Sequence, residues 1–188
     1  VKAVLRVPTD RGGEGVAVIA EGYWPAKQGR DALKVEWDTA SVEKPDTAQL
    51  LTQYRALAQQ TGTIAIPADV AALAIAPQKI SAEFTFPYLA HAPMEPLNCT
   101  VKLDGDKAEL WMGTQMPGLD AMAAAKVLGL QPQNVKVHTQ MAGGGFGRRA
   151  IPTSDYVVEA CGVAKAARTA GITAPVRTLW SREDDIKG

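Results

Sequence analysis

Apolar and polar residues alternate along the first 38 positions in patterns typical of short strands and one helix. Residues 15–21 (GVAVIAE) open with a continuous apolar run, which favours a buried strand. Residues 3–7 predict a second strand and residues 33–37 a third. Between them, residues 24–33 carry helix formers behind a proline, a residue that the first turn of a helix tolerates. The chain therefore begins with a zone of strands and one helix.

Residues 39–77 follow a different pattern. They open with a polar stretch, continue with a predicted helix at residues 47–60, and end in an alanine-rich stretch interrupted by Pro67 and Asp69. No apolar stripe or alternation here is strong enough to predict a core. We interpret this zone as a connecting segment.

Residues 78–188 hold the densest pattern. Asp104-Gly105 is a hairpin signal, Gly129 is a helix stop, and Thr153 or Ser154 is a helix cap. The predicted elements are a half-buried strand at 79–89, strands on either side of 104–105, a helix at 119–128, a strand at 134–141, a helix at 155–168 and a strand at 174–180. Helices and strands in this order predict an α+β fold with mixed sheets and packed helices.

Composition narrows the class of protein. The 20 Lys and Arg residues balance the 20 Asp and Glu residues, so no basic excess predicts a nucleic-acid partner. Cys99 and Cys161 have no CxxC spacing, and we expect two buried thiols without a disulfide. No apolar run approaches the roughly 20 residues that a membrane-spanning helix needs.

The glycine cluster at residues 143–147, followed by Arg148 and Arg149, is the sharpest chemical feature. Adjacent glycines free the backbone for conformations closed to other residues and allow a ligand to approach closely. Exposed N–H groups and two arginines suit an anion, above all a phosphate or pyrophosphate. A tight turn with a solvated arginine pair is the alternative.

This cluster matches one of two nucleotide-binding motifs in part. A P-loop needs Lys-Ser or Lys-Thr after its last glycine, and neither follows here. Gly145, Gly147 and Ala150 fit GxGxxA, the dinucleotide fingerprint. However, Pro152 and the predicted cap at Thr153 or Ser154 place the helix start beyond the glycines, and the next acidic residues lie too far along the chain.

Two further segments carry candidate polar groups. His91 and Glu95 lie four residues apart between prolines and could form an acid–base pair, but the scarcity of other ligands disfavours a metal site. Hydrogen bonding to buried backbone is the role we expect for both. Gln115 lies in a strand-to-helix loop, where its amide could face a ligand or serve as a surface group.

Taken in order, HAPMEPLNCT (91–100), GTQMP (113–117) and MAGGGFGRR (141–149) resemble the molybdopterin-binding subunits of the xanthine oxidase family. HAPMEP with GGGFGRR is similar to the isoquinoline 1-oxidoreductase beta-subunit branch, which includes aldehyde-oxidising members. Residues 1–38 resemble the end of the family's hammerhead domain. By this resemblance, residues 39–77 form a connecting segment and residues 78–188 the first part of the molybdopterin-binding domain.

The resemblance implies a molybdenum cofactor held by a pterin dithiolene, often a cytosine dinucleotide in bacteria. It assigns cofactor binding to Gln115, Gly144, Gly145, Phe146, Gly147 and Arg148. Gln115 would bond an oxo ligand of molybdenum, and no residue here would ligate the metal directly. The family's catalytic base, a glutamate, is expected outside this chain, which by itself should be inactive.

In purine-oxidising members a glutamate stands where this chain has Ala150, so the resemblance favours an N-heterocycle or an aldehyde as substrate. The remainder of the large subunit, an iron–sulfur small subunit with [2Fe–2S] clusters and a cytochrome c acceptor are the expected partners. The branch commonly works in the bacterial periplasm or at the membrane facing it; a cytoplasmic location also stays open. An NAD- or FAD-binding module and a structural domain without cofactor remain the alternatives.

Overall fold

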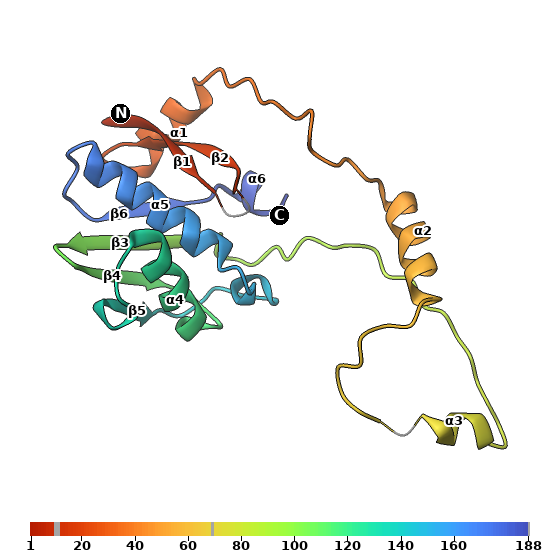
Figure 1. Cartoon of the computed structure of the whole chain (residues 1–188). Coiled ribbons are helices and arrows are strands. Elements are labelled where there is room, and N and C mark those ends of the chain that lie inside the picture. The colour runs from red at the N-terminus through yellow and green to blue at the C-terminus, as the bar shows by residue number, and fades with distance from the viewer. Residues whose placement is uncertain (10–11, 69, 188) are drawn as a thin grey trace. The chain divides into compact units, whose positions relative to one another are not determined.

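The computed structural model describes residues 1–9, 12–68 and 70–187, which divide into two units (Figure 1). The first unit comprises Val1–Leu33 and Tyr88–Gly188, and the second comprises Lys34–Pro87. Helices and strands of the first unit form an α+β fold with a mixed sheet, which confirms the predicted fold class.

The first unit is built on a four-stranded sheet with the order β5-β4-β3-β6. Its strands are β3 (Asn98–Asp104), β4 (Lys107–Met112), β5 (Val135–Thr139) and β6 (Val176–Leu179). β3 pairs antiparallel with β4 and β6, whereas β4 pairs parallel with β5. Gly105, with a φ of 58°, lies in the turn of the predicted hairpin.

Two helices cover one face of this sheet (Figure 1). They are α4 (Pro117–Leu128) and α5 (Asp155–Thr169). Gly129 ends α4 in the left-handed conformation that the sequence predicts. The buried apolar side chains between sheet and helices are Leu97, Cys99, Val101, Ala108, Leu110, Met112, Ala124, Ala125, Val135, Tyr156, Val157, Ala160, Cys161 and Ala164.

A second, two-stranded sheet packs on α5. It consists of β1 (Ala3–Pro8) and β2 (Glu14–Ile19), paired antiparallel and followed by α1 (Tyr23–Asp31). Val7 and Ile19 of the strands form a small core with Val163 and Ala167 of the helix. α5 therefore contributes to two cores, one with each sheet.

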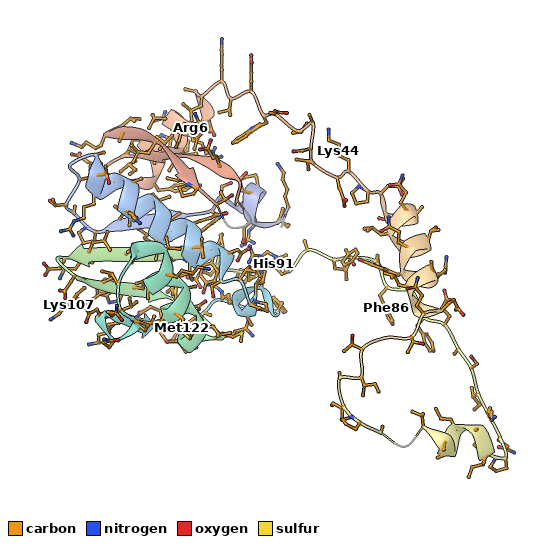
Figure 2. All side chains as sticks on the ribbon, in the orientation of Figure 1. Arg6, Lys44, Phe86, His91, Lys107 and Met122 are labelled. Atoms are coloured by element: carbon orange, nitrogen blue, oxygen red, sulfur yellow. The ribbon has the colours of Figure 1, made fainter. Side chains whose placement is uncertain are left out.

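The second unit contains α2 (Thr47–Ala58) and α3 (Ala71–Ile75), and none of its described residues is buried. Asp46 and Gln49 form a capping box at the start of α2. Figure 2 labels Lys44 and Phe86, which lie in segments without regular structure. The helix predicted at residues 47–60 is thus present as α2, and the described residues of this unit form no core of their own.

Two sequence predictions of strands are wrong. Residues 33–37 and 79–89 form no strand, although Phe84 and Phe86 alternate with polar residues as predicted. A strand requires hydrogen bonds to a neighbouring strand, and no described segment pairs with either stretch. Phe84 and Phe86 are 77% and 81% exposed. The sequence prediction also missed α3 and the short helix α6 (Arg182–Asp185).

Both cysteines are free thiols in the interior, as the sequence predicts. Burial, with a smaller contribution from the Asp120 charge, raises the pKa of Cys161 to about 12. Burial also raises the pKa of Cys99 well above its ordinary value. In the part of the chain that the structure describes, no helix is long and apolar enough to cross a membrane.

We expect Ellman's reagent to leave Cys99 and Cys161 unmodified in the native chain, because only an accessible thiolate reacts at a useful rate. In concentrated guanidinium chloride both thiols should react. The measurement is the absorbance of released thionitrobenzoate before and after unfolding. Rapid release of one equivalent from the folded chain would contradict the buried position of these residues.

Candidate functional site

The three segments singled out from the sequence meet at one end of the four-stranded sheet. Glu95 N–H donates to Gly143 O at 3.1 Å, and Gln115 N–H donates to Arg149 O at 3.1 Å. Gln140 N–H donates to Met112 O at 2.8 Å and so extends the pairing of β5 with β4 into the loops. Residues far apart along the chain therefore form one local structure.

Arg149 lies at the centre of this structure with its side chain fully buried. Its Nε donates to Gly144 O at 3.0 Å, and its Nη1 donates to Gly113 O at 3.1 Å. Its Nη2 donates to Glu95 O and Glu95 Oε2, both at 3.1 Å. The expectation that both arginines serve an anion is therefore wrong for Arg149, whose donors are already used inside the protein.

Glu95 supplies the carboxylate that Arg149 needs. Its Oε2 also accepts from Gly143 N–H at 2.8 Å, and its Oε1 accepts from Asn98 Nδ2 at 2.8 Å. Burial raises the pKa of Glu95, but these hydrogen bonds and the positive charges of Arg149 and Arg177 lower it further, so that the net pKa falls below 4.5. The stabilisation is complete above that ordinary value and is lost as the pH falls through the lower folded pKa. The backbone-bonding role predicted for Glu95 is confirmed.

His91 contacts a side chain instead of backbone. Its Nε2 lies 3.2 Å from Oδ1 of Asp185, a residue of α6 whose side chain is fully buried (Figure 2). Arg182, on the same helix, donates to Pro93 O and to Met94 O. The segment that leads into Glu95 is thus fixed to the C-terminal helix. Among the described residues, no group of three potential ligands could hold a metal ion.

Three of the glycines lack a Cβ because their own chain occupies the space. A Cβ on Gly143 would lie 2.5 Å from Glu95 Cβ, and one on Gly144 would lie 2.8 Å from Pro93 Cβ. A Cβ on Gly145 would lie 2.7 Å from Gln115 Oε1. The first two glycines are therefore required for internal packing, and the third leaves room for the Gln115 amide.

The other end of the glycine loop is open to solvent. Phe146 has a φ of 51° and is 76% exposed, and Gly147 has a φ of 85° with no atom within 4 Å of the point that a Cβ would occupy. Positive φ values turn successive peptide groups and make concave sites for anions. A ligand could therefore approach the backbone at residues 145–147, which agrees with part of the sequence prediction.

Arg148 has a partner of its own. Its Nη1 lies 2.8 Å from Oδ1 of Asp155, and its side chain is 15% exposed. Asp155 is the first residue of α5, and its Oδ1 also accepts from Tyr156 N–H. The predicted cap is wrong in detail, since Ser154 precedes the helix in a left-handed conformation and its hydroxyl makes no capping bond.

The Gln115 loop is held on both sides while the Gln115 residue itself is exposed. Thr114 Oγ1 donates to the buried carboxylate of Asp120, and it accepts from Met116 N–H at 2.9 Å. On the other side, Tyr156 Oη donates to Gly113 O at 3.1 Å. The structure therefore brings Gln115 and Gly145 together, and it presents the Gln115 side chain on a fixed backbone.

Several of these supports were missed by sequence reasoning. Asp120, Tyr156 and Thr114 are ordinary helix or loop residues in the sequence, and only their burial reveals their role. The second polar cluster of the sheet, in which His138 stacks on Trp111 and pairs with Glu109 at 2.8 Å, lies on β4 and β5. It accounts for the second histidine of the chain.

The helix start separates this loop from a dinucleotide-binding loop. The fingerprint requires the glycines to open the helix directly, whereas α5 begins at Asp155, after a 3-10 turn at Arg148–Ala150. The profile of the family described as "Molybdopterin cofactor-binding domain" matches residues 52–188. The chain belongs to this family. This membership confirms the family resemblance and replaces the NAD- or FAD-binding alternative.

Two curated relatives align with most of the chain. The isoquinoline 1-oxidoreductase subunit beta of Brevundimonas diminuta is 31% identical over 92% of this chain and 23% of its own length. The membrane-bound aldehyde dehydrogenase (pyrroloquinoline-quinone) of Gluconacetobacter polyoxogenes is 29% identical over 92% of this chain and 22% of its own length. The chain therefore spans about a quarter of the length of these relatives.

One solved structure is also similar. Quinoline 2-oxidoreductase from Pseudomonas putida 86 matches with a TM-score of 0.46 and 19% identity, over 62% of this chain and 14% of that chain. The assignment of residues 1–38 to a hammerhead domain, of residues 39–77 to a connecting segment and of residues 78–188 to the cofactor domain stays a prediction.

We expect Gly143→Ala to lower the free energy of unfolding by about 1–3 kcal/mol, because the new methyl group overlaps the Glu95 side chain. Gly118→Ala is the matched control. Gly118 lies in α4 with no atom within 4 Å of the added methyl position, so alanine should be neutral or stabilise the helix by up to about 1 kcal/mol. Urea denaturation measures both, and equal effects would show that Gly143 is not packed against Glu95.

Proposed function

We propose that this chain forms part of the large subunit of a molybdenum hydroxylase and helps to hold its molybdopterin cofactor. The observation that carries the proposal is the position of Gln115, whose amide lies against the backbone of Gly145 at the start of the open stretch 145–147. An amide donor and Cβ-free backbone at one surface position suit an anionic, bulky ligand. Family membership and the names of the relatives support the same assignment.

The residues present fit such a cofactor, because the loop offers open backbone where a ligand must approach closely. Gln115 would donate its amide hydrogens to the metal end of the cofactor. Backbone at Gly144, Gly145 and Gly147, with the exposed ring of Phe146, would pack against the pterin. Arg148 would neutralise phosphate charge while it keeps its contact with Asp155. When bound, the cofactor supplies the redox chemistry that these side chains lack.

The substrate we propose is an N-heterocycle or an aldehyde, oxidised with oxygen from water. Ala150 has no polar group in its side chain and could not orient a purine by hydrogen bonding. The relatives are named for isoquinoline and aldehyde oxidation. A nicotinate dehydrogenase subunit of Pseudomonas putida, 26% identical over 90% of this chain and 14% of its own length, adds a third small-molecule dehydrogenase.

The remaining expectations extend the proposal to the whole enzyme. An iron–sulfur subunit with [2Fe–2S] clusters would accept the electrons, since the two cysteines of this chain are buried thiols. The rest of the large subunit would complete the site and supply the catalytic glutamate. A cytosine dinucleotide form of the pterin, a cytochrome c acceptor and a periplasmic location belong to the same proposal. Subunit names among the relatives support a multi-subunit enzyme.

A structural domain that binds no cofactor is the second candidate. The packing of Gly143 and Gly144 against Glu95 and Pro93 favours it, because internal contacts alone explain these two glycines. It does not explain the open backbone at Gly147 or the presentation of Gln115. Cofactor content of the purified enzyme separates the two candidates.

In the intact large subunit, Gln115→Ala should lower turnover about 10- to 100-fold without unfolding the protein, because the exposed amide contributes to the cofactor and not to the core. Gln133→Ala, at the opposite end of β5, is the control and should keep full activity. Steady-state kinetics and molybdenum content measure the effect. Unchanged turnover at full metal content would remove Gln115 from the site.

The purified 188-residue chain should contain no stoichiometric molybdenum, because it spans about a quarter of the relatives' length and one side of the loop is open. Inductively coupled plasma mass spectrometry of the folded chain is the measurement. About one molybdenum per chain would show that these residues bind the cofactor without further protein.

A further inference from the structure

We infer that Arg149 and Glu95 are a pair of positioning residues, which fix the Gln115 loop and the glycine loop relative to each other. This inference rests on the proposed function, because it concerns the same site. Arg149 is fully buried and therefore cannot touch a cofactor at the open end of the loop. Its influence must pass through the residues that it bonds.

The contacts of Arg149 reach each segment close to a proposed cofactor residue. Gly113 O, an acceptor of Nη1, lies two positions before Gln115, and Gly144 O, the acceptor of Nε, lies next to Gly145. The backbone oxygen of Arg149 also accepts from Gln115 N–H. One residue thus holds the two groups whose separation sets the shape of the site.

Only an arginine can make this set of contacts. A guanidinium carries five N–H donors in a rigid plane, and Arg149 directs four hydrogen bonds to acceptors on three segments. A lysine offers three donors from a single nitrogen atom and could not reach the same acceptors together. We therefore expect Arg149→Lys to keep the charge while it loses the geometry.

Glu95 completes the pair in two ways. Its carboxylate neutralises the buried guanidinium, which would otherwise be strongly unfavourable away from water. The same oxygen accepts from Gly143 N–H, and Glu95 N–H donates to Gly143 O. Glu95 is thus bonded to the first glycine of the loop through both its backbone and its side chain.

The pair lies outside the main hydrophobic core. The core residues beside it, such as Met112 and Tyr156, belong to β4 and α5, which are held by their own ladders and apolar packing. Loss of the pair should therefore loosen the loops locally and leave the sheet folded. This distinction separates a positioning role from a purely structural one.

The experiment compares Arg149→Lys, Arg149→Met and Glu95→Gln in the intact, assembled enzyme. Arg168→Met, at the exposed end of α5, is the control. We expect each site variant to lose turnover about 10- to 100-fold with KM changed less than about threefold, as supports of metal-site residues do. Molybdenum per subunit should fall in the same variants, and the control should match the unmodified enzyme.

Hydrogen–deuterium exchange gives the readout that is independent of activity. Peptides that cover residues 91–97 and 141–150 should exchange faster in the variants, while peptides from β3 and β4 keep their protection. Faster exchange across the whole sheet would mean that the pair only supports the fold, and it would overturn the inference. So would normal turnover, metal content and loop protection in Arg149→Lys and Glu95→Gln.

A double variant guards against the case in which Arg149→Met does not fold. Arg149→Met with Glu95→Gln removes both charges, so the fold should recover while turnover stays low, because the hydrogen bonds to Gly113 and Gly144 are still missing. Recovery of both would overturn the positioning role. If the unmodified enzyme contains no molybdenum, the proposed function itself fails, and this result is distinct from any of the outcomes above.

Discussion

A guanidinium group that is cut off from water needs acceptors for its N–H groups and a negative charge nearby. In this protein the backbone oxygens of Gly113, Gly144 and Glu95 provide the acceptors, and the Glu95 carboxylate provides the charge. Three loops must keep their relative positions to satisfy these requirements. The shape of the candidate site is therefore determined by groups that lie beneath it.

This arrangement changes the meaning of the glycine cluster. Its first glycines make room for Glu95 and Pro93, its third makes room for the Gln115 amide, and Gly147 leaves backbone exposed. A glycine-rich sequence thus serves internal packing at one end and ligand access at the other. The two arginines that follow are divided in the same way, because Arg149 points into the protein and Arg148 lies near the surface beside Asp155.

Much of the fold could be predicted from local patterns. The hairpin at Gly105, the stop at Gly129 and helix α5 depend on turn chemistry and apolar periodicity, which a sequence displays directly. The strand predicted at residues 79–89 failed because pairing depends on a neighbour that periodicity does not reveal. For the site, the motifs indicated Gln115 and the glycines, whereas the role of Arg149 depended on burial. Two adjacent arginines look alike in a sequence, and only the folded chain shows which one is buried.

The pairing of Arg149 with Glu95 uses only atoms of the polypeptide, and the backbone at Gly147 faces outward. A loop that is already held by its own side chains loses little conformational entropy when a ligand arrives. Such a seat can be completed during folding and filled afterwards, because nothing in its construction requires the guest to be present. The order of biosynthetic events, with the polypeptide maturing before it is loaded, follows from where one arginine points.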